Sequence, residues 1–361
     1  MTIYIILYSL LFPIIFSDKR SIPLSHKKLI ILIFVIIFTL FRGLRWECGT
    51  DWEQYHQVFL SSEWNNIFTF NRYGEEIMEY GYMFTNILLK SIIPSYTFFL
   101  LVTNFFILFS YYKFSFRYAQ FPIITFVTLI FCSNFFPVRQ NIAVAIALLS
   151  LPYVFKRKIY KFILLIIAAM SFHTSAIVFL PVYFIYRFEI NIIIRISICI
   201  LAIICGKYLK DIFILISDFI GWSMISNRLE IYSRITKEEI ISRSWSGTFI
   251  LMTWLYIFYI SQKKLHIMQD KHFSLFINLY NLYLIITFIF ATDMQELGRM
   301  SDYFWPSFCI LFACFIGKCL YLPNKVYGII YAFFIFYMSY KFIGLTHFYP
   351  ELMFPYKSIF G

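Results

Sequence analysis

Residues 27–59 read KKLIILIFVIIFTLFRGLRWECGTDWEQYHQVF. Two lysines open the stretch, a mainly apolar run occupies 29–44, and arginine, tryptophan and carboxylate residues follow it. A bilayer-spanning helix needs about 20 mostly apolar residues, with a range of roughly 17–25. Because charged residues bound the run at both ends, we predict a membrane span here that leads into a polar loop.

The whole chain has the composition of a membrane protein. Of its 361 residues, 61% are hydrophobic, 22% are aromatic and only 14% are charged, and the mean hydropathy is +0.74. A soluble domain carries about 25% charged residues. A soluble core could not bury so much apolar surface, whereas a bilayer can. These values exclude a soluble globular, disordered, collagen-like or coiled-coil chain.

Apolar runs predict an all-α polytopic membrane protein that forms one integral membrane domain over 1–361. The N-terminal run has no basic start and no small-residue cleavage site, so we expect a retained span rather than a signal peptide. Segment 82–93 is too short to cross and is expected to be re-entrant or to lie in the interface. About twelve spans are predicted, at 2–16, 29–44, 96–112, 119–136, 140–155, 162–186, 190–206, 211–225, 247–262, 273–292, 303–317 and 325–343.

The charged residues orient these spans. With 17–28 placed inside and the sides alternating after it, the inner turns hold 17 basic and three acidic residues. The spans and the outer side hold the other 14 basic and 16 acidic residues. This distribution obeys the positive-inside rule and puts both termini outside. The outer loops are then 42–95, 226–246 and 293–302, with short turns at 134–141 and 187–191.

The kind of basic residue also differs between the two sides. Inside, 14 of the 17 basic residues are lysines, whereas 10 of the other 14 are arginines. Arginine presents a planar fork that binds phosphate or carboxylate through two bonds, and lysine presents a point charge. The arginines are therefore the candidate anion site. The inner basic loops are too short to form a nucleic-acid groove, so we expect no nucleic-acid partner.

The first motif is FRGLRWECGTDWEQYHQVF, residues 41–59. Gly49 and Thr50 allow a sharp turn where the chain leaves the bilayer. Asp51 and Tyr55 follow the turn and Arg45 precedes it, so an arginine and a carboxylate meet at the membrane surface. Anchoring of the tryptophans in the interface explains the same stretch equally well.

A second motif, EEIMEYGY, ends the first long outer loop at residues 75–82. Glu79 precedes the short apolar segment there, where partial burial would raise the pKa of its carboxyl and suit a general base. A solvated acidic loop is the alternative.

Two further motifs lie within spans. In NFFPVRQNIAVAIALLS, residues 134–150, Pro137 opens a helix and Arg139 lies in its first turn, where the free N–H groups favour an anion. A snorkelling arginine is the alternative. In MSFHTSAIVFLP, residues 170–181, His173 is an ionisable residue in an apolar stretch. Such residues default to functional candidates, although a neutral histidine bonded within the bundle is equally possible.

The last motifs are NRLEIYSRI, residues 227–235, and MQELGRMSDYFWP, residues 294–306. They put Arg228, Tyr232 and Arg299 in outer loops, and Arg299 near a helix start repeats the arrangement of Arg139. A solvated loop is the alternative. No sequence motif for a metal or an organic cofactor is present, and we expect neither.

In this order the motifs resemble the EpsG family of Wzy-type polysaccharide polymerases. The resemblance spans about residues 40–360. It rests on these pieces: Arg45-x-x-x-Gly49-Thr50-Asp51 with Tyr55, Glu79-x-Gly81-Tyr82, Arg139-Gln140-x-Ile142-Ala143, His173-Thr174-Ser175-Ala176, Arg228 with Tyr232, Arg299 with Tyr303-Phe304, and Pro355-Tyr356-Lys357-Ser358.

The resemblance implies a GT-C-like glycosyltransferase of the bacterial inner membrane, with its active site facing the periplasm. It would transfer a growing undecaprenyl-diphosphate-linked glycan of an O-antigen (lipopolysaccharide), capsule or exopolysaccharide onto a lipid-linked repeat unit. Membrane lipids, and the flippase and chain-length regulator of the same pathway, are the implied partners. The implied substrate-binding residues are Arg45, Arg139, Arg228, Arg299, Tyr55, Tyr82, Gln140 and Tyr232.

Three groups could take the proton of the acceptor hydroxyl. We rank Glu79 first and His173 second, because depth in a span would keep the histidine neutral and away from the surface. Asp51 ranks third, since Arg45 close by in sequence would lower the pKa of its carboxyl, which suits orienting an arginine or binding sugar. Two other functions stay open, a flippase for the lipid-linked sugar and a membrane acyltransferase that modifies surface sugars.

Overall fold

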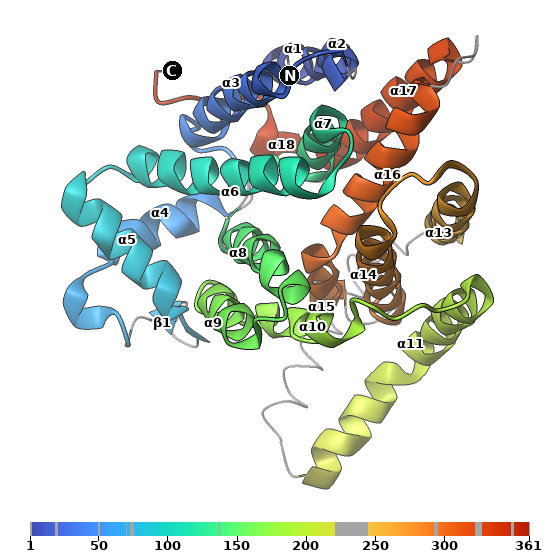
Figure 1. Cartoon of the computed structure of the whole chain (residues 1–361). Coiled ribbons are helices and arrows are strands. Elements are labelled where there is room, and N and C mark those ends of the chain that lie inside the picture. Colours follow the sequence, from blue (N-terminus) through green and yellow to red (C-terminus); the bar gives the residue numbers. More distant parts are fainter. Residues whose placement is uncertain are drawn as a thin grey trace. The chain divides into compact units, whose positions relative to one another are not determined.

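The computed structural model describes the chain except residues 1, 19–20, 50, 70, 73–75, 137, 221–244, 292–294, 322–326, 348–349 and 361. The described part is helical apart from a two-residue β ladder, which confirms the predicted helical class (Figure 1). Its residues form two compact units. Unit 1 comprises Met1–Tyr183 and Phe312–Gly361, and unit 2 comprises Phe184–Leu311. A single integral membrane domain stays a prediction.

Unit 1 contains a bundle of apolar helices and a polar segment between α3 and α6. The bundle helices are α1 (Thr2–Ser9), α2 (Leu11–Ile14), η1 (Ile15–Asp18), α3 (Leu24–Gly43), α6 (Tyr96–Tyr118), α7 (Pro122–Cys132), α8 (Arg139–Phe155), α9 (Ile159–Met170), η3 (Thr174–Phe179), α10 (Val182–Ile185) and α17 (Tyr327–His347). The polar segment holds α4 (Trp52–Ser61), η2 (Trp64–Asn66), β1 (Asn71–Arg72), β2 (Glu76–Ile77) and α5 (Tyr80–Ile92). α18 (Pro350–Met353) precedes the C-terminal tail.

The described residues of unit 2 form three long helices and two short helical segments. These elements are α11 (Ile192–Ile220), α13 (Trp245–Leu265), α14 (Asp270–Ile289), α15 (Gln295–Gly298) and η4 (Arg299–Tyr303). α16 (Trp305–Leu320) begins in unit 2 and ends in unit 1. α11 can approach α14 closely because Gly206 has no side chain: a Cβ there would lie 2.5 Å from the carbonyl oxygen of Ile289.

Among the described residues, four helices are long and apolar enough to cross a membrane. They cover Leu24–Gly43, Tyr96–Tyr118, Asp270–Ile289 and Tyr327–Leu345. Other apolar helices, such as α7 and α8, have 11 and 17 residues and span only about 17–26 Å at 1.5 Å per residue. A polytopic membrane protein agrees with these helices, whereas the predicted number of twelve spans is not confirmed.

Polar side chains inside the unit 1 bundle bond to the carbonyls of their own helices. The Thr125 hydroxyl donates to the Phe121 carbonyl at 2.8 Å, and the Asn104 amide donates to the Leu100 carbonyl at 2.7 Å. Such bonds satisfy polar groups where no water is available. Small residues let α8 pack closely against its neighbours: Ala143, Ala145 and Ala147 are each at most 1% exposed.

The segment 162–186 does not form the single span that we predicted. α9 ends at Met170, and the chain then returns alongside it, so that the Phe162 and Tyr183 rings lie 5.5 Å apart. The Arg157 guanidinium, just before α9, donates to the Tyr183 carbonyl at 2.8 Å and lies over the Tyr183 ring. Residues 159–185 therefore form a re-entrant hairpin whose two ends share one side of unit 1.

The polar residues in the middle of this segment account for the reversal. The Ser171 hydroxyl donates to the Ala168 carbonyl at 2.8 Å, and Nδ1 of His173 lies 2.5 Å from the Ser175 hydroxyl. These side chains bond at the tip, where the backbone leaves the helix. The position of His173 differs from the prediction accordingly: it lies at the hairpin tip and not midway along a crossing helix.

The two predicted spans at 190–206 and 211–225 are also wrong as separate elements, because α11 runs unbroken through the expected turn at Lys207 and Lys210. Lysine and leucine are good helix formers, so charge alone does not end a helix. The surroundings of the 187–191 turn in unit 2 bear on its predicted side as well. Residues 188–191 line one cavity together with Lys263 of α13 and Ser274 of α14. These last two residues flank the lysine-rich turn between α13 and α14, which the charge pattern predicts to be inner.

The hairpin and the continuous helix together remove two crossings and leave the predicted sides of all later loops unchanged. On this topology, Arg187 and Arg195 are expected on the inner side and not among the outer or spanning arginines. Segment 82–93 is α5, a 13-residue helix that buries one face, including Tyr82 and Met83, and exposes Phe84 and Ile92. This agrees with a helix lying in the interface.

Candidate functional site

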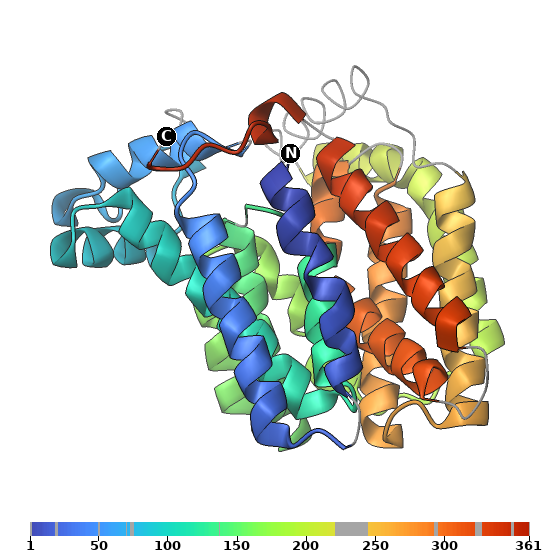
Figure 2. The ribbon, with the colours of Figure 1, turned by 90° about the horizontal axis from the view of Figure 1, so that it is seen from above.

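The candidate site lies at the end of unit 1 that holds 44–52, 134–139 and the C-terminal tail, which we call the outer end. Here the tail pairs with the loop after α3 (Figure 2). The Trp46 amide donates to the Lys357 carbonyl at 2.9 Å, and the Gly49 amide donates to the Leu352 carbonyl at 2.8 Å. The Tyr356 hydroxyl donates to the Phe41 carbonyl at 2.7 Å. The tail therefore fixes the loop that carries Arg45.

Gly49 gives this loop its turn, as the sequence predicts. Its φ of +106° favours glycine, and a Cβ there would lie 3.2 Å from the Phe136 ring.

Arg45 is buried in this loop, and no carboxylate of the described residues pairs with it. Its residue surface is 2% exposed, and its guanidinium carbon lies 4.6 Å from the centre of the Phe136 ring. Nε and Nη1 have no hydrogen-bond partner among the described residues. Burial lowers the pKa of Arg45, yet a guanidinium stays protonated in proteins. An uncompensated buried charge is costly, so this residue is prepared to bind an anion.

Arg42 is a residue that the candidate list from sequence omitted. It is fully buried one helical turn before Arg45, and Nη2 donates to the Ser133 hydroxyl at 2.8 Å. Nε and Nη1 have no partner in the described part of the chain. The i, i+3 spacing of the arginines in RGLR, which puts both on one helix face, was the signal that could have identified it.

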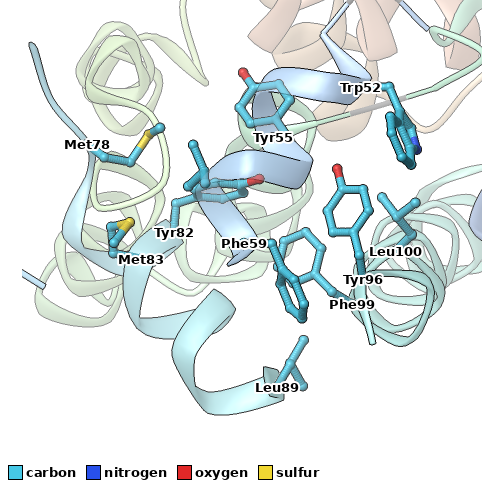
Figure 3. Packing of buried hydrophobic residues seen from close by; sticks show 11 residues of the cluster. Trp52, Tyr55, Phe59, Met78, Tyr82, Met83, Leu89, Tyr96, Phe99 and Leu100 are labelled. Atoms are coloured by element: carbon cyan, nitrogen blue, oxygen red, sulfur yellow. The ribbon is translucent and has the colours of Figure 1, made fainter. Parts of the chain in front are cut away.

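An aromatic cluster of tyrosines lies next to these arginines. The Tyr55 and Tyr82 rings lie 5.7 Å apart, and both Tyr82 and Tyr96 contact the Phe99 ring (Figure 3). Burial raises the pKa of Tyr82 well above its ordinary value. Its hydroxyl therefore remains a donor, and it has no partner among the described residues. Tyr96 belongs to this cluster and was not predicted as a site residue.

Arg139 lies on another side of the same cluster. Its Nε donates to the Tyr55 hydroxyl at 3.0 Å, and Nη1 donates to the Glu79 carboxylate. The guanidinium carbon lies 5.4 Å from the centre of the Tyr55 ring and 5.9 Å from that of Tyr82. The two charged side chains are only 13% and 14% exposed. The structure thus joins Arg139, Glu79, Tyr55 and Tyr82, four of the residues predicted for the site.

Glu79 precedes α5 and is partly buried, as predicted. Its partner was not predicted: the Arg139 guanidinium donates to the Glu79 carboxylate and forms an ion pair with it. In return Glu79 holds the fork of Arg139 in place. An anion that competes for Arg139 would release the Glu79 carboxylate.

The hairpin tip docks beside Glu79. The Gly81 and Tyr82 amides, at the start of α5, donate to the Ser171 carbonyl at 2.8 and 3.3 Å. A Cβ on Gly81 would lie 2.2 Å from the Ser171 hydroxyl oxygen, so only glycine leaves room for this contact. His173, two residues along the tip, is therefore brought to the same end of α5 as Glu79.

The other predicted residues have different surroundings. Asp51 occupies the position before α4, makes no side-chain cap bond and forms no ion pair with Arg45. Gln140 follows Arg139 in α8 and is half-buried. Arg299 belongs to unit 2, where it begins η4 and is exposed. Arg228 and Tyr232 lie outside the described residues, as do Thr50 and Pro137.

A comparison with protein families identifies a match over nearly the whole chain. The model described as the EpsG family matches residues 28–358, which include the arginines, tyrosines and Glu79 of the outer end. Comparisons with curated proteins and with solved structures found no match.

Proposed function

Because the chain belongs to the EpsG family, a family of Wzy-type polymerases, we propose that it polymerises lipid-linked oligosaccharide repeat units. The reaction transfers a growing glycan from undecaprenyl diphosphate onto the non-reducing sugar of a second lipid-linked unit. The site faces the outer side of a bacterial inner membrane. The flippase that delivers the units and a regulator of chain length are the partners that this reaction requires.

The proposal rests on one observation: two arginines that differ in their hydrogen-bond partners lie next to the same tyrosine cluster. Arg139 is paired with Glu79, whereas Arg45 is buried with unpaired nitrogens. The Arg139 guanidinium carbon lies 5.9 Å from the centre of the Tyr82 ring, and Trp46, the residue after Arg45, packs against the same cluster. Such a site suits a diphosphate, which carries several oxygens and offers acceptors to more than one fork.

The arginines act on the leaving group. In the reaction the bond between the anomeric carbon of the donor glycan and the diphosphate oxygen breaks, and the electron pair leaves with the diphosphate. Arg45 and Arg42 stabilise the charge that develops there, because their unpaired N–H groups need no rearrangement of a protein partner. The Tyr82 hydroxyl supplies a further donor.

Glu79 acts on the acceptor. When the donor diphosphate binds Arg139, the Glu79 carboxylate is released from its ion pair. It then accepts the proton of the acceptor hydroxyl, and the hydroxyl oxygen bonds to the anomeric carbon. His173 at the hairpin tip is the second candidate for this proton. Trp46, which is only partly buried against the cluster, offers an aromatic face on which a sugar can stack.

The test is a reconstitution of the purified protein with lipid-linked repeat units extracted from a strain that lacks the polymerase. Polymerisation predicts a ladder of chain lengths on lipid diphosphate, with free undecaprenyl diphosphate as the second product. Transbilayer movement of the unit without elongation would replace the proposal with a flippase. Acetyl transfer to the sugars would replace it with an acyltransferase.

A further inference from the structure

Unit 2 contains a cavity far along the chain from the candidate active site. Its volume is about 270 Å³, and it lies between the 188–191 turn, the start of α11, the end of α13 and the start of α14. The same end of unit 2 carries the lysines of the turn between α13 and α14, which the charge pattern predicts to be inner. The charge pattern therefore predicts that this cavity lies on the inner side of the membrane.

A buried arginine lines this cavity. Arg195 is 2% exposed, and two neutral groups hold its guanidinium: Nε donates to the Ile190 carbonyl at 3.0 Å and Nη2 to the Asn278 amide oxygen at 2.6 Å. Nη1 has no hydrogen-bond partner, and no carboxylate pairs with Arg195 in the described part of the chain. The charge is fixed in position and is not neutralised, which is costly for a buried cation.

The rest of the lining suits the phosphate of an amphiphile. Lys263, which lies over the Tyr259 ring, adds a second positive charge, while Glu189 is the one acid in the lining. The net formal charge of these groups is therefore +1. Phe188, Ile190 and Phe273 supply apolar contacts beside the charges. Basic pockets between membrane helices on the inner side bind anionic lipid headgroups.

We propose that this cavity binds a phosphate-bearing anion, with Arg195 as the fixed contact and Lys263 as the second charge. Lipid headgroups at the inner surface are the nearest source, because apolar side chains and charges line the cavity together. A soluble phosphate compound offers the same chemistry. The proposal does not depend on the polymerase activity.

The experiment uses the purified full chain with equal mole fractions of phosphatidylglycerol and phosphatidylcholine, and native mass spectrometry counts the retained lipids. The wild type should retain phosphatidylglycerol in preference. Arg195→Gln should lower that preference by about 10-fold or more, as for the loss of a charged hydrogen bond. Lys263→Gln should lower it less. Arg187→Gln, which removes a charge from the same turn outside the cavity, should leave it unchanged.

A second arm distinguishes the source of the phosphate. If the natural ligand is soluble, inorganic phosphate should raise the unfolding temperature of the wild type in phosphatidylcholine alone, and Arg195→Gln should abolish the rise. Lys263→Gln covers the case in which Arg195→Gln fails to fold. Equal behaviour of the wild type, Lys263→Gln and Arg187→Gln in both arms would overturn the proposal.

Discussion

Replacing Arg139 with lysine should slow polymerisation although the positive charge is kept. The guanidinium uses Nε for the Tyr55 hydroxyl and Nη1 for the Glu79 carboxylate, and it lies within 6 Å of two tyrosine rings. A lysine ammonium is a point donor and cannot reproduce the fork. Loss of one charge-assisted bond costs about 1.5–3 kcal/mol, which corresponds to roughly 10–150-fold in rate.

The assay is the initial rate of chain elongation by purified protein with lipid-linked repeat units. Arg187→Lys is the matched control, since Arg187 is exposed and lies over a single ring, that of Tyr186. Its rate should stay within about twofold of the wild type. The Tyr55→Phe variant closes a double-mutant cycle: if the bond to Tyr55 orients Arg139, the two losses are less than additive. Wild-type rate and chain length in Arg139→Lys would refute the reasoning.

Further predictions concern the base, the hairpin and the topology. Glu79→Gln keeps the shape but cannot accept a proton, so it should abolish elongation; near wild-type activity with an inactive His173→Ala would transfer the role to His173. Gly81→Ala should displace the hairpin tip and lower activity, whereas Gly328→Ala, with nothing within 4 Å of the new Cβ, should be neutral; equal activities would contradict this docking. A cysteine at Glu189 should resist an impermeant reagent added from outside, while one at Glu63 reacts; labelling of both would restore the predicted span at 162–186.

Uninterrupted apolar runs were sufficient to predict two of the long helices, although α6 continues past Lys113 and Arg117. The runs at 29–44 and 96–112 correspond to α3 and α6 within a few residues. Hydropathy could not distinguish the hairpin from a single span. The 25 residues of 162–186 are mainly apolar, and their length suits one full crossing of the bilayer or two half-crossings equally well. The polar residues at its tip were the available signal, and His173 was considered as a functional group and not as a turn.

The site was predicted in part for similar reasons. Arg139, Glu79, Tyr55 and Tyr82 were chosen separately, and the structure joins them. The pairing of Glu79 with Arg139 depends on residues 60 positions apart, which no local pattern encodes. The same is true of the C-terminal tail: its residues were part of the family resemblance, but their contact with the Arg45 loop follows only from the fold.

In the proposed reaction the Arg139–Glu79 pair takes part in the chemistry and does not merely hold the start of α5 to α8. The double variant Glu79→Arg with Arg139→Glu keeps an ion pair between the two positions. In it the carboxylate and the guanidinium have changed places. The measurement is the ladder formed by this purified double variant, with its unfolding temperature as the check on structure. We expect a folded protein that forms no ladder. A ladder of wild-type length and rate would contradict it and leave the pair a purely structural role.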